Sequence, residues 1–408
     1  MIERVAYLVL HTSPLLQPGI GSAGGMNVYV DELARTMAGR GVEAVVFTRR
    51  TDPDQPASIE VRDGYRVVHI DAGPAGPLPM SELMSHVAEF GEGVVAETRN
   101  AGFDLVHSHY WLSGWAGVLV KEVHGLPLAN SFHTLGRVKD VGRRSDEAPS
   151  STARLRAEDG VIAASDCVIA STPYEFDDLI EHYAASPERL CISRPGIDHT
   201  LFTPGDRNEA RVRVGIGDEP IILCVGRIQA HKGFDVAIDM LSHLPKTLAS
   251  GSGPPLLMII GGPSGPDGRR EVEHLHARAR AIGVSERVLF VPPQPHGSMV
   301  NYSRAADLLV MPSHSESFGL VAAEAQASGL PVVAARVGGL PYVVSASKSG
   351  LLVEGRDPRS FAAAATAILD HPRFRSSLST GAVEFAARFS WDGTADRLLD
   401  LYSGIMGR

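Results

Sequence analysis

An α/β protein with two doubly wound domains is the fold class that the sequence predicts. The chain has 408 residues, more than one hydrophobic core usually serves. Short apolar, β-branched runs alternate with longer helical patterns throughout, which indicates parallel strands joined by crossover helices. Residues 202–220 are rich in Pro, Gly and charge and separate the two series of strands, and we place the domain junction near residues 196–205. Two Rossmann-like domains, 1–198 and 206–390, would then face a cleft.

The strands are expected where apolar runs are shortest and most β-branched. In the first half these runs lie at 4–10, 43–49, 66–70, 104–109, 127–132, 167–171 and 190–193, and in the second at 221–226, 256–261, 288–291, 308–312 and 331–335. Runs this apolar belong to sheets covered on both faces. A last helix over 391–408 should pack back on the first domain. Ligands of such sheets bind beyond the carboxyl ends of the strands, so functional residues should follow strands.

Charge and composition exclude several classes of partner. The net charge is −9 and the basic residues are scattered, which argues against nucleic acid. No apolar run approaches the roughly 20 residues needed to cross a bilayer, so no membrane partner is expected. Small-molecule substrates remain, and a homodimer is one candidate for the oligomeric state. Cys167, Cys191 and Cys224 each lie in an apolar stretch, which predicts buried reduced thiols and a cytoplasmic protein.

A glycine-rich segment precedes the first helix. Gly19, Gly21 and Gly24 satisfy the pattern G-x-G-x-x-G, which is weak evidence for a dinucleotide site when it stands alone. The glycines do not directly follow the first strand, and the second strand ends in Arg49 and Arg50 where an acidic residue is typical. An NADP-dependent oxidoreductase that uses these arginines remains an alternative. The segment also offers free N–H groups at a helix start, which suit oxygen or phosphate.

Three histidines follow buried strands. His107 and His109 end one strand and His133 follows the next. A histidine pair and a distant third, without a placed carboxylate, predict no metal site. Histidines at strand ends in a cleft can hydrogen-bond sugar hydroxyls, whereas His107 and His109 could equally be core residues.

Two further segments combine charges in the second half. Arg227 and Lys232 follow a strand, and Gly233 precedes a helix, a pattern that favours binding of a departing nucleoside diphosphate. Glu316 and Glu324 are eight residues apart around a helix start, so both carboxylates can face one cleft. Paired carboxylates occur in glycosidases, but a hydrolase does not need the two cations. A nucleotide-sugar enzyme uses all four.

The chain resembles the family-4 retaining glycosyltransferases of GT-B fold over essentially its whole length. The most specific segments are HTSPLLQPGIGSAGGMNVYV, HSHYWLSG, GRIQAHKG, GGPSGP and ESFGLVAAEAQASG. Within that family the likeness is strongest to members of the mycothiol pathway. The resemblance implies transfer of N-acetylglucosamine or a related hexose from a UDP-sugar to the cyclitol 1D-myo-inositol 3-phosphate. It implies no metal and no cofactor, with the UDP-sugar as a substrate, and proton acceptance by the leaving diphosphate.

The same resemblance assigns residues to the donor, the acceptor and catalysis. Arg227 and Lys232 would bind the diphosphate, Glu324 the ribose, Glu316 and Gly25 the donor sugar and diphosphate, and His133 would lie near the reacting sugar; His11 and Asn27 would meet the cyclitol ring, and Tyr110, Thr134 and Arg154 its phosphate. The catalytic set is then His133, Arg227, Lys232 and Glu316. The first domain would bind the acceptor and the second the nucleotide sugar.

One position departs from the family pattern. Where the inositol-phosphate enzymes carry a further phosphate-binding lysine after AGP, this chain has Met80 at or near that place. The loss of one charge-assisted contact costs about 1.5–3 kcal/mol. An unphosphorylated aminocyclitol such as 2-deoxystreptamine, as in aminoglycoside biosynthesis, is therefore an alternative acceptor. A non-catalytic sugar-binding protein on the same fold is a third possibility.

Overall fold

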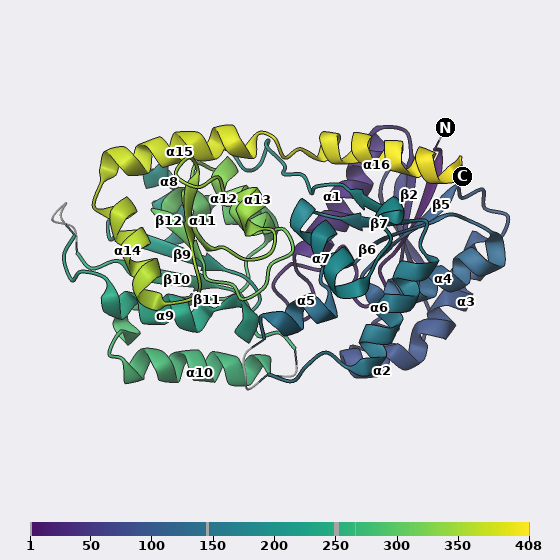
Figure 1. Cartoon of the computed structure of the whole chain (residues 1–408), viewed down its shortest axis with the longest axis horizontal. Helices are drawn as coiled ribbons and strands as arrows, with labels where there is room; N and C mark the ends of the chain where they lie inside the picture. The colour runs from purple at the N-terminus through teal and green to yellow at the C-terminus, as the bar shows by residue number, and fades with distance from the viewer. Residues whose placement is uncertain (1, 144–146, 249–252, 266, 408) are drawn as a thin grey trace.

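The computed structural model describes residues 2–143, 147–248, 253–265 and 267–407. Within these ranges the chain forms two sheets, one from each half, and helices cover both faces of each sheet (Figure 1). The predicted α/β fold class with two doubly wound domains is thereby confirmed. All the strand runs expected from the sequence are strands, and two edge strands, β3 and β14, are additional.

The first sheet has a switch in strand order at its centre. Its order is β3 (Ser58–Arg62), β4 (Tyr65–Ile70), β2 (Glu43–Arg49), β1 (Arg4–Leu8), β5 (Leu105–His109), β6 (Leu128–Ser131), β7 (Cys167–Ala170) and β8 (Leu190–Ile192). All neighbours pair in parallel except β3 and β4, which are antiparallel. The connections after β1 and β5 leave in opposite directions, which opens a crevice above these strand ends.

The second sheet repeats this arrangement with six strands. Its order is β11 (Val288–Val291), β10 (Leu256–Ile260), β9 (Ile221–Val225), β12 (Leu308–Met311), β13 (Val332–Ala335) and β14 (Gly350–Val353), with every pair parallel. The order switches between β9 and β12. Loops that follow these two strands are therefore expected to hold ligand.

The helices of the first half begin and end at local signals. They are α1 (Gly25–Gly39), α2 (Met80–Leu83), α3 (Val87–Thr98), α4 (Trp111–His124), α5 (Gly136–Val141), α6 (Thr152–Ala164) and α7 (Pro173–Tyr183). Thr172 caps α7 by accepting a hydrogen bond from the Glu175 N–H, with Pro173 at the first helical position. Gly125 ends α4 at φ 70°, a left-handed conformation that glycine adopts without strain.

The helices of the second half cover its sheet in the same way, and the last one leaves it. They are α8 (Arg207–Val214), α9 (Phe234–His243), α10 (Gly268–Ala281), α11 (Met299–Ala305), α12 (Leu320–Ala327), α13 (Leu340–Val343), α14 (Pro358–Leu369), α15 (Pro372–Ala386) and α16 (Trp391–Met406). Figure 1 shows α15 along the second domain and α16 along the first, with the two chain ends close together.

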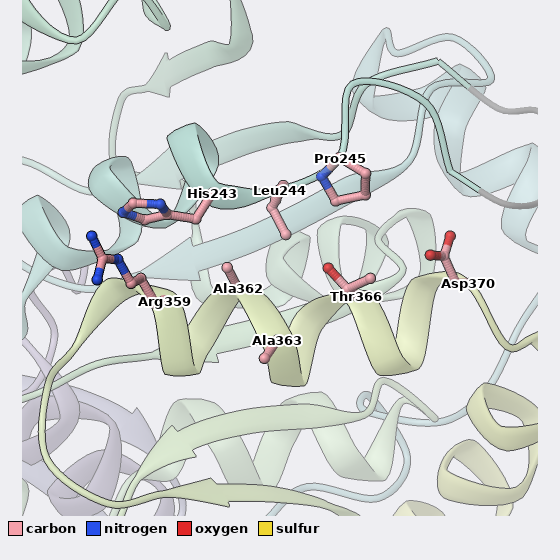
Figure 2. A pocket seen from close by; sticks show the side chains of 8 residues that line it. All are labelled: His243, Leu244, Pro245, Arg359, Ala362, Ala363, Thr366 and Asp370. Carbon is pink, nitrogen blue, oxygen red and sulfur yellow. The ribbon is translucent and has the colours of Figure 1, made fainter.

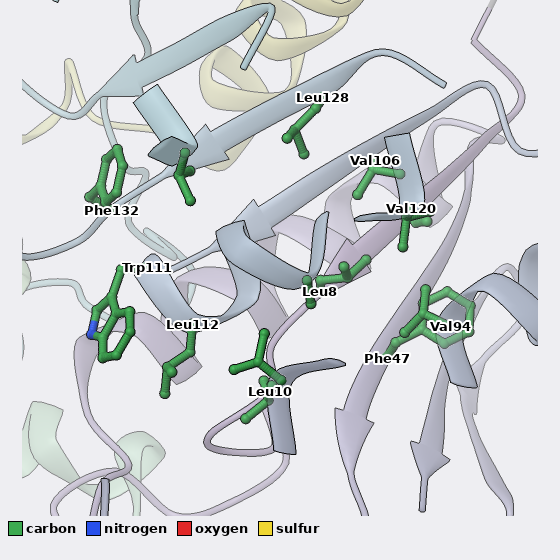
Figure 3. Packing of buried hydrophobic residues seen from close by; sticks show 14 of the residues in the cluster. Leu8, Leu10, Phe47, Val94, Val106, Trp111, Leu112, Val120, Leu128 and Phe132 are labelled. Atoms are coloured by element: carbon green, nitrogen blue, oxygen red, sulfur yellow. The ribbon is translucent and has the colours of Figure 1, made fainter. Parts of the chain in front are cut away.

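Each sheet face has its own core. Figure 3 shows one of them, where α3 and α4 pack on the first sheet through Phe47, Val94, Val106, Leu112 and Val120. These side chains are at most 1% exposed. Truncating one such residue to alanine typically costs about 2–5 kcal/mol. The strand-end loops above are thus held on a rigid base.

The chain passes between the two domains twice. The first passage runs through Gly196, where a Cβ would lie 2.2 Å from the Trp391 backbone nitrogen, so the two connections touch. They pair at Ile197 and Ser390. Ser390 then caps α16 by accepting from the Gly393 N–H at 3.1 Å. Trp391 and the apolar face of α16 pack against α1 in the core of the first sheet. Residue 408 lies outside the described ranges.

One expectation about the cysteines is wrong. Cys167 on β7 and Cys191 on β8 form a disulfide, and Cys224 is a buried free thiol. The 24-residue separation along the chain showed no pairing pattern, but β7 and β8 are neighbouring strands and bring the two Cα atoms within 6.2 Å. The inference of a cytoplasmic location from reduced thiols loses that support. Within the described ranges, no helix is both long and apolar enough to cross a bilayer.

Candidate functional site

The glycine-rich loop between β1 and α1 bridges the two domains. The Ser264 hydroxyl donates to the Gly21 carbonyl at 2.6 Å, and the Arg227 guanidinium donates to the Ser22 carbonyl at 3.4 Å. Gly24 lies so close to Arg227 that a Cβ there would be 3.1 Å from its Nε. The absence of a side chain at Gly24 therefore admits the guanidinium of the other domain. At the start of α1, Gly25 faces Leu320 of the second domain.

Asn27 has a structural role in this structure. It was expected to contact the acceptor, but its side chain is 1% exposed. Its Nδ2 donates to the Thr12 hydroxyl at 2.8 Å and to the Ser13 carbonyl at 2.6 Å, and its Oδ1 accepts from the Gly24 N–H. Both amide hydrogens are thus used to hold the loop before α1. The side-chain oxygen supplies the partner that the backbone N–H at this helix start does not find within the helix.

The second domain supplies a cluster of charges after β9 and β12. The Lys232 Nζ lies 2.6 Å from Glu316 Oε2, and these side chains are 21% and 16% exposed. Burial lowers the pKa of Arg227, against the opposing influence of Tyr110 and Glu316. Gly233 follows Lys232 at φ 70°, and a Cβ there would lie 2.1 Å from the Pro312 carbonyl oxygen. The chain therefore needs glycine at this turn. Two cations with one carboxylate leave an excess of positive charge for an anion.

Glu324 has a different basic partner. Its Oε1 lies 2.7 Å from His296 Nε2, and both side chains are mostly buried. Burial opposes charge on His296, but the adjacent Glu324 carboxylate and more distant Glu32 and Asp198 raise its pKa overall. The sequence placed Glu316 and Glu324 near one cleft, and the structure gives each a separate basic side chain. His296 itself was missed, because only the fold brings it to α12.

On the opposite side of the cleft, four of the five predicted acceptor residues, all except Asn27, lie close together. The His11 and Tyr110 rings have centroids 4.6 Å apart, and the Arg154 guanidinium lies 5.4 Å above the Tyr110 ring. The Arg154 Nη2 donates to the Thr134 carbonyl at 3.1 Å. Burial lowers the pKa of His11 to about 3, with smaller contributions from Arg227, His133 and Arg154. An uncharged imidazole and a cation thus lie side by side.

His133 sits where the two domains meet. Its backbone adopts φ 59°, a left-handed conformation uncommon outside glycine, and its carbonyl accepts from the Ser317 hydroxyl at 2.5 Å. Its Nε2 lies 2.9 Å from His109 Nδ1. Burial lowers the pKa of His133 to about 3, so the ring is neutral at physiological pH. It can therefore hydrogen-bond a hydroxyl but cannot neutralise an anion.

The other two histidines are core residues. His107 is fully buried between the Tyr402 hydroxyl, 2.6 Å from Nδ1, and the Ser131 hydroxyl, 2.9 Å from Nε2. His109 is also fully buried beside His133. The core interpretation of this pair is the one that the structure supports. In the part of the chain that is described, no three His, Cys, Asp or Glu side chains are arranged to hold a metal ion.

A separate groove lies on the outer side of the second domain. Figure 2 shows it between the end of α9 and α14, lined by His243, Leu244, Arg359, Thr366 and Asp370 among others. None of the predicted site residues contributes to it. The cleft residues, by contrast, follow β1, β5, β6, β9 and β12, as expected for doubly wound sheets.

Comparison with known proteins agrees with this geometry. A model of group 1 glycosyl transferases matches residues 206–385, and a glycosyl transferase 4-like domain matches residues 24–196. The chain is 45% identical to the D-inositol 3-phosphate glycosyltransferase 2 of Catenulispora acidiphila over 98% of this chain and 95% of the relative. This chain belongs to the same glycosyltransferase family as the D-inositol 3-phosphate glycosyltransferases and has the GT-B fold.

Solved structures show the same fold. Sucrose-phosphate synthase from Thermosynechococcus elongatus superposes with this glycosyltransferase at a TM-score of 0.91 and 32% identity, over 99% of each chain. HepE from Anabaena in complex with UDP-glucose superposes at 0.77, with 18% identity over 98% of this chain and 99% of the other. At that identity the second likeness supports the fold alone.

The oxidoreductase alternative is therefore wrong for this glycosyltransferase. The two arginines that could have held an NADP phosphate are occupied elsewhere. Arg49 donates to the Pro74 carbonyl at 2.7 Å and also bonds the Gly76 carbonyl, while Arg50 pairs with Asp71. The glycine pattern instead forms the loop that meets the second domain.

Two further residues of this glycosyltransferase were missed by sequence reasoning. Lys139 on α5 has a lowered pKa, mainly because it is buried and also because the positive charges of Arg154 and Arg227 lie nearby. The carboxylates of Glu147 and Asp140 oppose this shift. Glu158 on α6 lies fully buried beneath Arg154. Neither belongs to a conspicuous motif. A lysine three residues into a short helix reads as solvated surface until the tertiary structure shows its neighbours.

Proposed function

We propose that this glycosyltransferase transfers N-acetylglucosamine or a related hexose from a UDP-sugar to 1D-myo-inositol 3-phosphate with retention of anomeric configuration. The observation that carries the proposal is the arrangement of two distinct cationic groups across one cleft. Arg227 and Lys232 lie on the second domain, and Arg154 with Lys139 lies on the first. Two separate phosphate-bearing substrates account for both groups.

The donor side fits a nucleoside diphosphate. As the bond between the anomeric carbon and the diphosphate breaks, negative charge grows on the leaving phosphate, and Arg227 and Lys232 stabilise it. Glu316, now paired with Lys232 at 2.6 Å, would turn to sugar hydroxyls when the phosphate takes its place. Glu324 would accept from the ribose hydroxyls.

The chemical step needs no base from the protein. The acceptor oxygen attacks the anomeric carbon on the face from which the diphosphate leaves, and its proton passes to the departing phosphate oxygen. Products are the glycoside and UDP. His133, neutral at physiological pH, would hydrogen-bond a hydroxyl of the donor sugar and position the reacting carbon. We propose that the reaction uses no metal or cofactor, which undiminished turnover with a chelator would support.

The acceptor side favours a phosphate. Arg154, Thr134 and Tyr110 form a polar corner, and Lys139 lies close enough to Arg154 for their charges to interact. In this proposal the charge of Lys139 would replace the lysine that Met80, 37% exposed at the start of α2, does not supply. A bound phosphate would offset the mutual repulsion of these cations. An aminocyclitol would bring its own positive charge to the same place.

The second candidate acceptor, an unphosphorylated aminocyclitol such as 2-deoxystreptamine, is favoured only by Met80. Both candidates are tested by incubating the enzyme with UDP-N-acetylglucosamine or UDP-glucose and either inositol 3-phosphate, inositol or 2-deoxystreptamine. Mass spectrometry identifies the product and NMR its anomeric configuration. Turnover of 2-deoxystreptamine but not inositol 3-phosphate would overturn the proposal. Binding of the UDP-sugar without turnover of any acceptor would indicate a non-catalytic protein.

A further inference from the structure

A single buried carboxylate connects three segments behind the proposed acceptor site. Glu158 on α6 is 0% exposed. Its Oε1 accepts from Arg154 Nε at 2.7 Å, and its Oε2 accepts from the Tyr183 hydroxyl at 2.5 Å. Both oxygens lie 3.1 Å from the Gly136 N–H at the start of α5. The carboxylate therefore ties α5, α6 and the end of α7 together.

Arg154 is held from two directions by these contacts. Its Nε is used by Glu158, and its Nη2 by the Thr134 carbonyl and hydroxyl. Its Nη1 makes no hydrogen bond with any residue in the described ranges. A guanidinium with two nitrogens fixed loses little further freedom when the third binds an anion. Buried charges of this kind persist when they are fully paired, as Glu158 is.

We propose that Glu158, supported by Tyr183, is a positioning residue that presents Arg154 to the phosphate of the acceptor and so sets the preference for a phosphorylated cyclitol. The inference rests on the proposed function. Glu158 itself touches no substrate. It acts by orienting a planar donor whose geometry matches phosphate, an orientation that a flexible arginine would have to acquire on binding.

The contacts on the other side of Tyr183 support the same view. Its hydroxyl also accepts from the Arg137 N–H at 2.9 Å, and the Arg137 guanidinium lies 4.4 Å above its ring. Tyr183 therefore relays the position of α7 to the carboxylate. Arg137 in turn pairs with the exposed Asp159, the residue next to Glu158. The chain thus provides a matched control one position away.

The kinetic test compares Glu158→Gln with Asp159→Asn. For Glu158→Gln we expect the KM for inositol 3-phosphate to rise about 10- to 100-fold, the scale of one charge-assisted contact. Its kcat, its KM for the UDP-sugar and its KM for unphosphorylated inositol should change less than about threefold. Asp159→Asn should match the parent throughout. An equal loss for phosphorylated and unphosphorylated acceptors would show a purely structural role and overturn the proposal.

Hydrogen exchange at Arg154, measured by NMR in the absence of any acceptor, separates this inference from the proposed function. In protein labelled with ¹⁵N-arginine, the Arg154 Nε–H signal, assigned by its loss in Arg154→Lys, should exchange slowly with solvent. Glu158→Gln should abolish that protection. Protection that persists in Glu158→Gln overturns the positioning role. If protection is lost but inositol 3-phosphate is not a substrate, the positioning of Arg154 stands and the assigned acceptor fails.

Tyr183→Phe keeps the test decisive if Glu158→Gln does not fold. It removes one hydrogen bond from the carboxylate but leaves the contact with Arg154 in place. We expect a smaller rise, about 3- to 10-fold, in the KM for inositol 3-phosphate alone. A Tyr183→Phe enzyme with parental KM values and parental Arg154 protection would contradict the proposed support.

Discussion

The two sides of the cleft use opposite electrostatic strategies. On the first domain, His11 and His133 are half-buried and neutral, with pKa values lowered to about 3, and the fully buried core residue His107 shares this property. On the second domain, Lys232 and His296 pair with Glu316 and Glu324, and the pKa of His296 is raised overall. Burial without a carboxylate suppresses the charge on a histidine, whereas burial beside one sustains it.

This difference suits the substrates that we propose for the two sides. Neutral rings can donate to or accept from hydroxyl groups without adding charge to the reacting centre. In the proposed reaction, Lys232 would exchange its internal partner Glu316 for the diphosphate, so that this lysine is paired whether the site is empty or occupied. The arginine on the first side, Arg154, is the exception, and it has its own buried carboxylate.

The largest effect is expected at Arg227 and Lys232, the two cations proposed to bind the leaving diphosphate. Lys232→Ala or Arg227→Ala should lower kcat by about two to three orders of magnitude, the scale of removing a preorganised charge at a developing anion. Steady-state kinetics measure the loss, and a thermal melt checks that folding survives. Lys348→Ala, which removes an exposed ion pair with Glu384 in the same domain, is the matched control. Near-parental kcat in the first two variants would show that these cations do not act on the diphosphate.

A smaller effect should come from altering the cations near the acceptor. Lys139→Met should raise the KM for inositol 3-phosphate about tenfold or more, because a charged contact is lost. Met80→Lys should lower that KM and weaken binding of 2-deoxystreptamine, whose ammonium groups would be repelled. The two acceptors thus respond with opposite sign. A Met80→Lys enzyme identical to the parent on both would place residue 80 outside the acceptor site.

The contrast between the histidines predicts a dependence of stability on pH. His107 and His133 resist protonation when folded but accept a proton near pH 6.5 when unfolded. Stability should therefore fall as the pH drops from about 6.5 toward 3, by about 1.4 kcal/mol per pH unit for each such histidine. His296 has the opposite sign, since its raised pKa favours the folded state below pH 6.5 and this stabilisation disappears as the pH rises through its folded pKa.

Urea denaturation at pH 7.5, 6.5 and 5.5 measures this dependence. His296→Ala should steepen the loss of stability in acid. His107→Gln should reduce the slope of unfolding free energy against pH by the amount that one proton contributes. A stability that is flat from pH 7.5 to 5.5 in the parent would contradict the neutral histidines of the first domain.

The smallest effect is expected where Tyr402 on α16 contacts the neutral His107 of the first domain. Tyr402→Phe removes the hydroxyl that lies 2.6 Å from His107 Nδ1 and leaves a buried ring nitrogen without that partner. We expect a loss of about 1–3 kcal/mol in the free energy of unfolding, with kcat near the parent value. Tyr174→Phe, at a 44% exposed position, is the control and should change neither quantity. Equal stability of the two variants would remove the structural role of the Tyr402 hydroxyl.

Sequence patterns were sufficient for most of the strands and insufficient at the edges. Central strands such as β1 and β9 are continuous apolar runs because both faces of the sheet are covered. β3 alternates exposed and half-buried residues with charges, and β14 begins with a glycine and has two half-buried leucines at its centre, so neither shows that signal. Pairing with a neighbour, which depends on distant residues, makes them strands.

By itself the sequence determined the fold class, because the periodicity of apolar residues is a local property. It also pointed to the segments that carry the glycines, Arg227 with Lys232, and the two glutamates, because turns that require glycine are local as well. Only the tertiary structure decided which partner each buried polar group takes. It paired Cys167 with Cys191, placed His296 at Glu324, enclosed Asn27 in a structural loop, and put Glu158 behind Arg154. The physical reason is that desolvation and hydrogen bonding act between residues far apart in the chain, and no spacing rule in one sequence encodes those contacts.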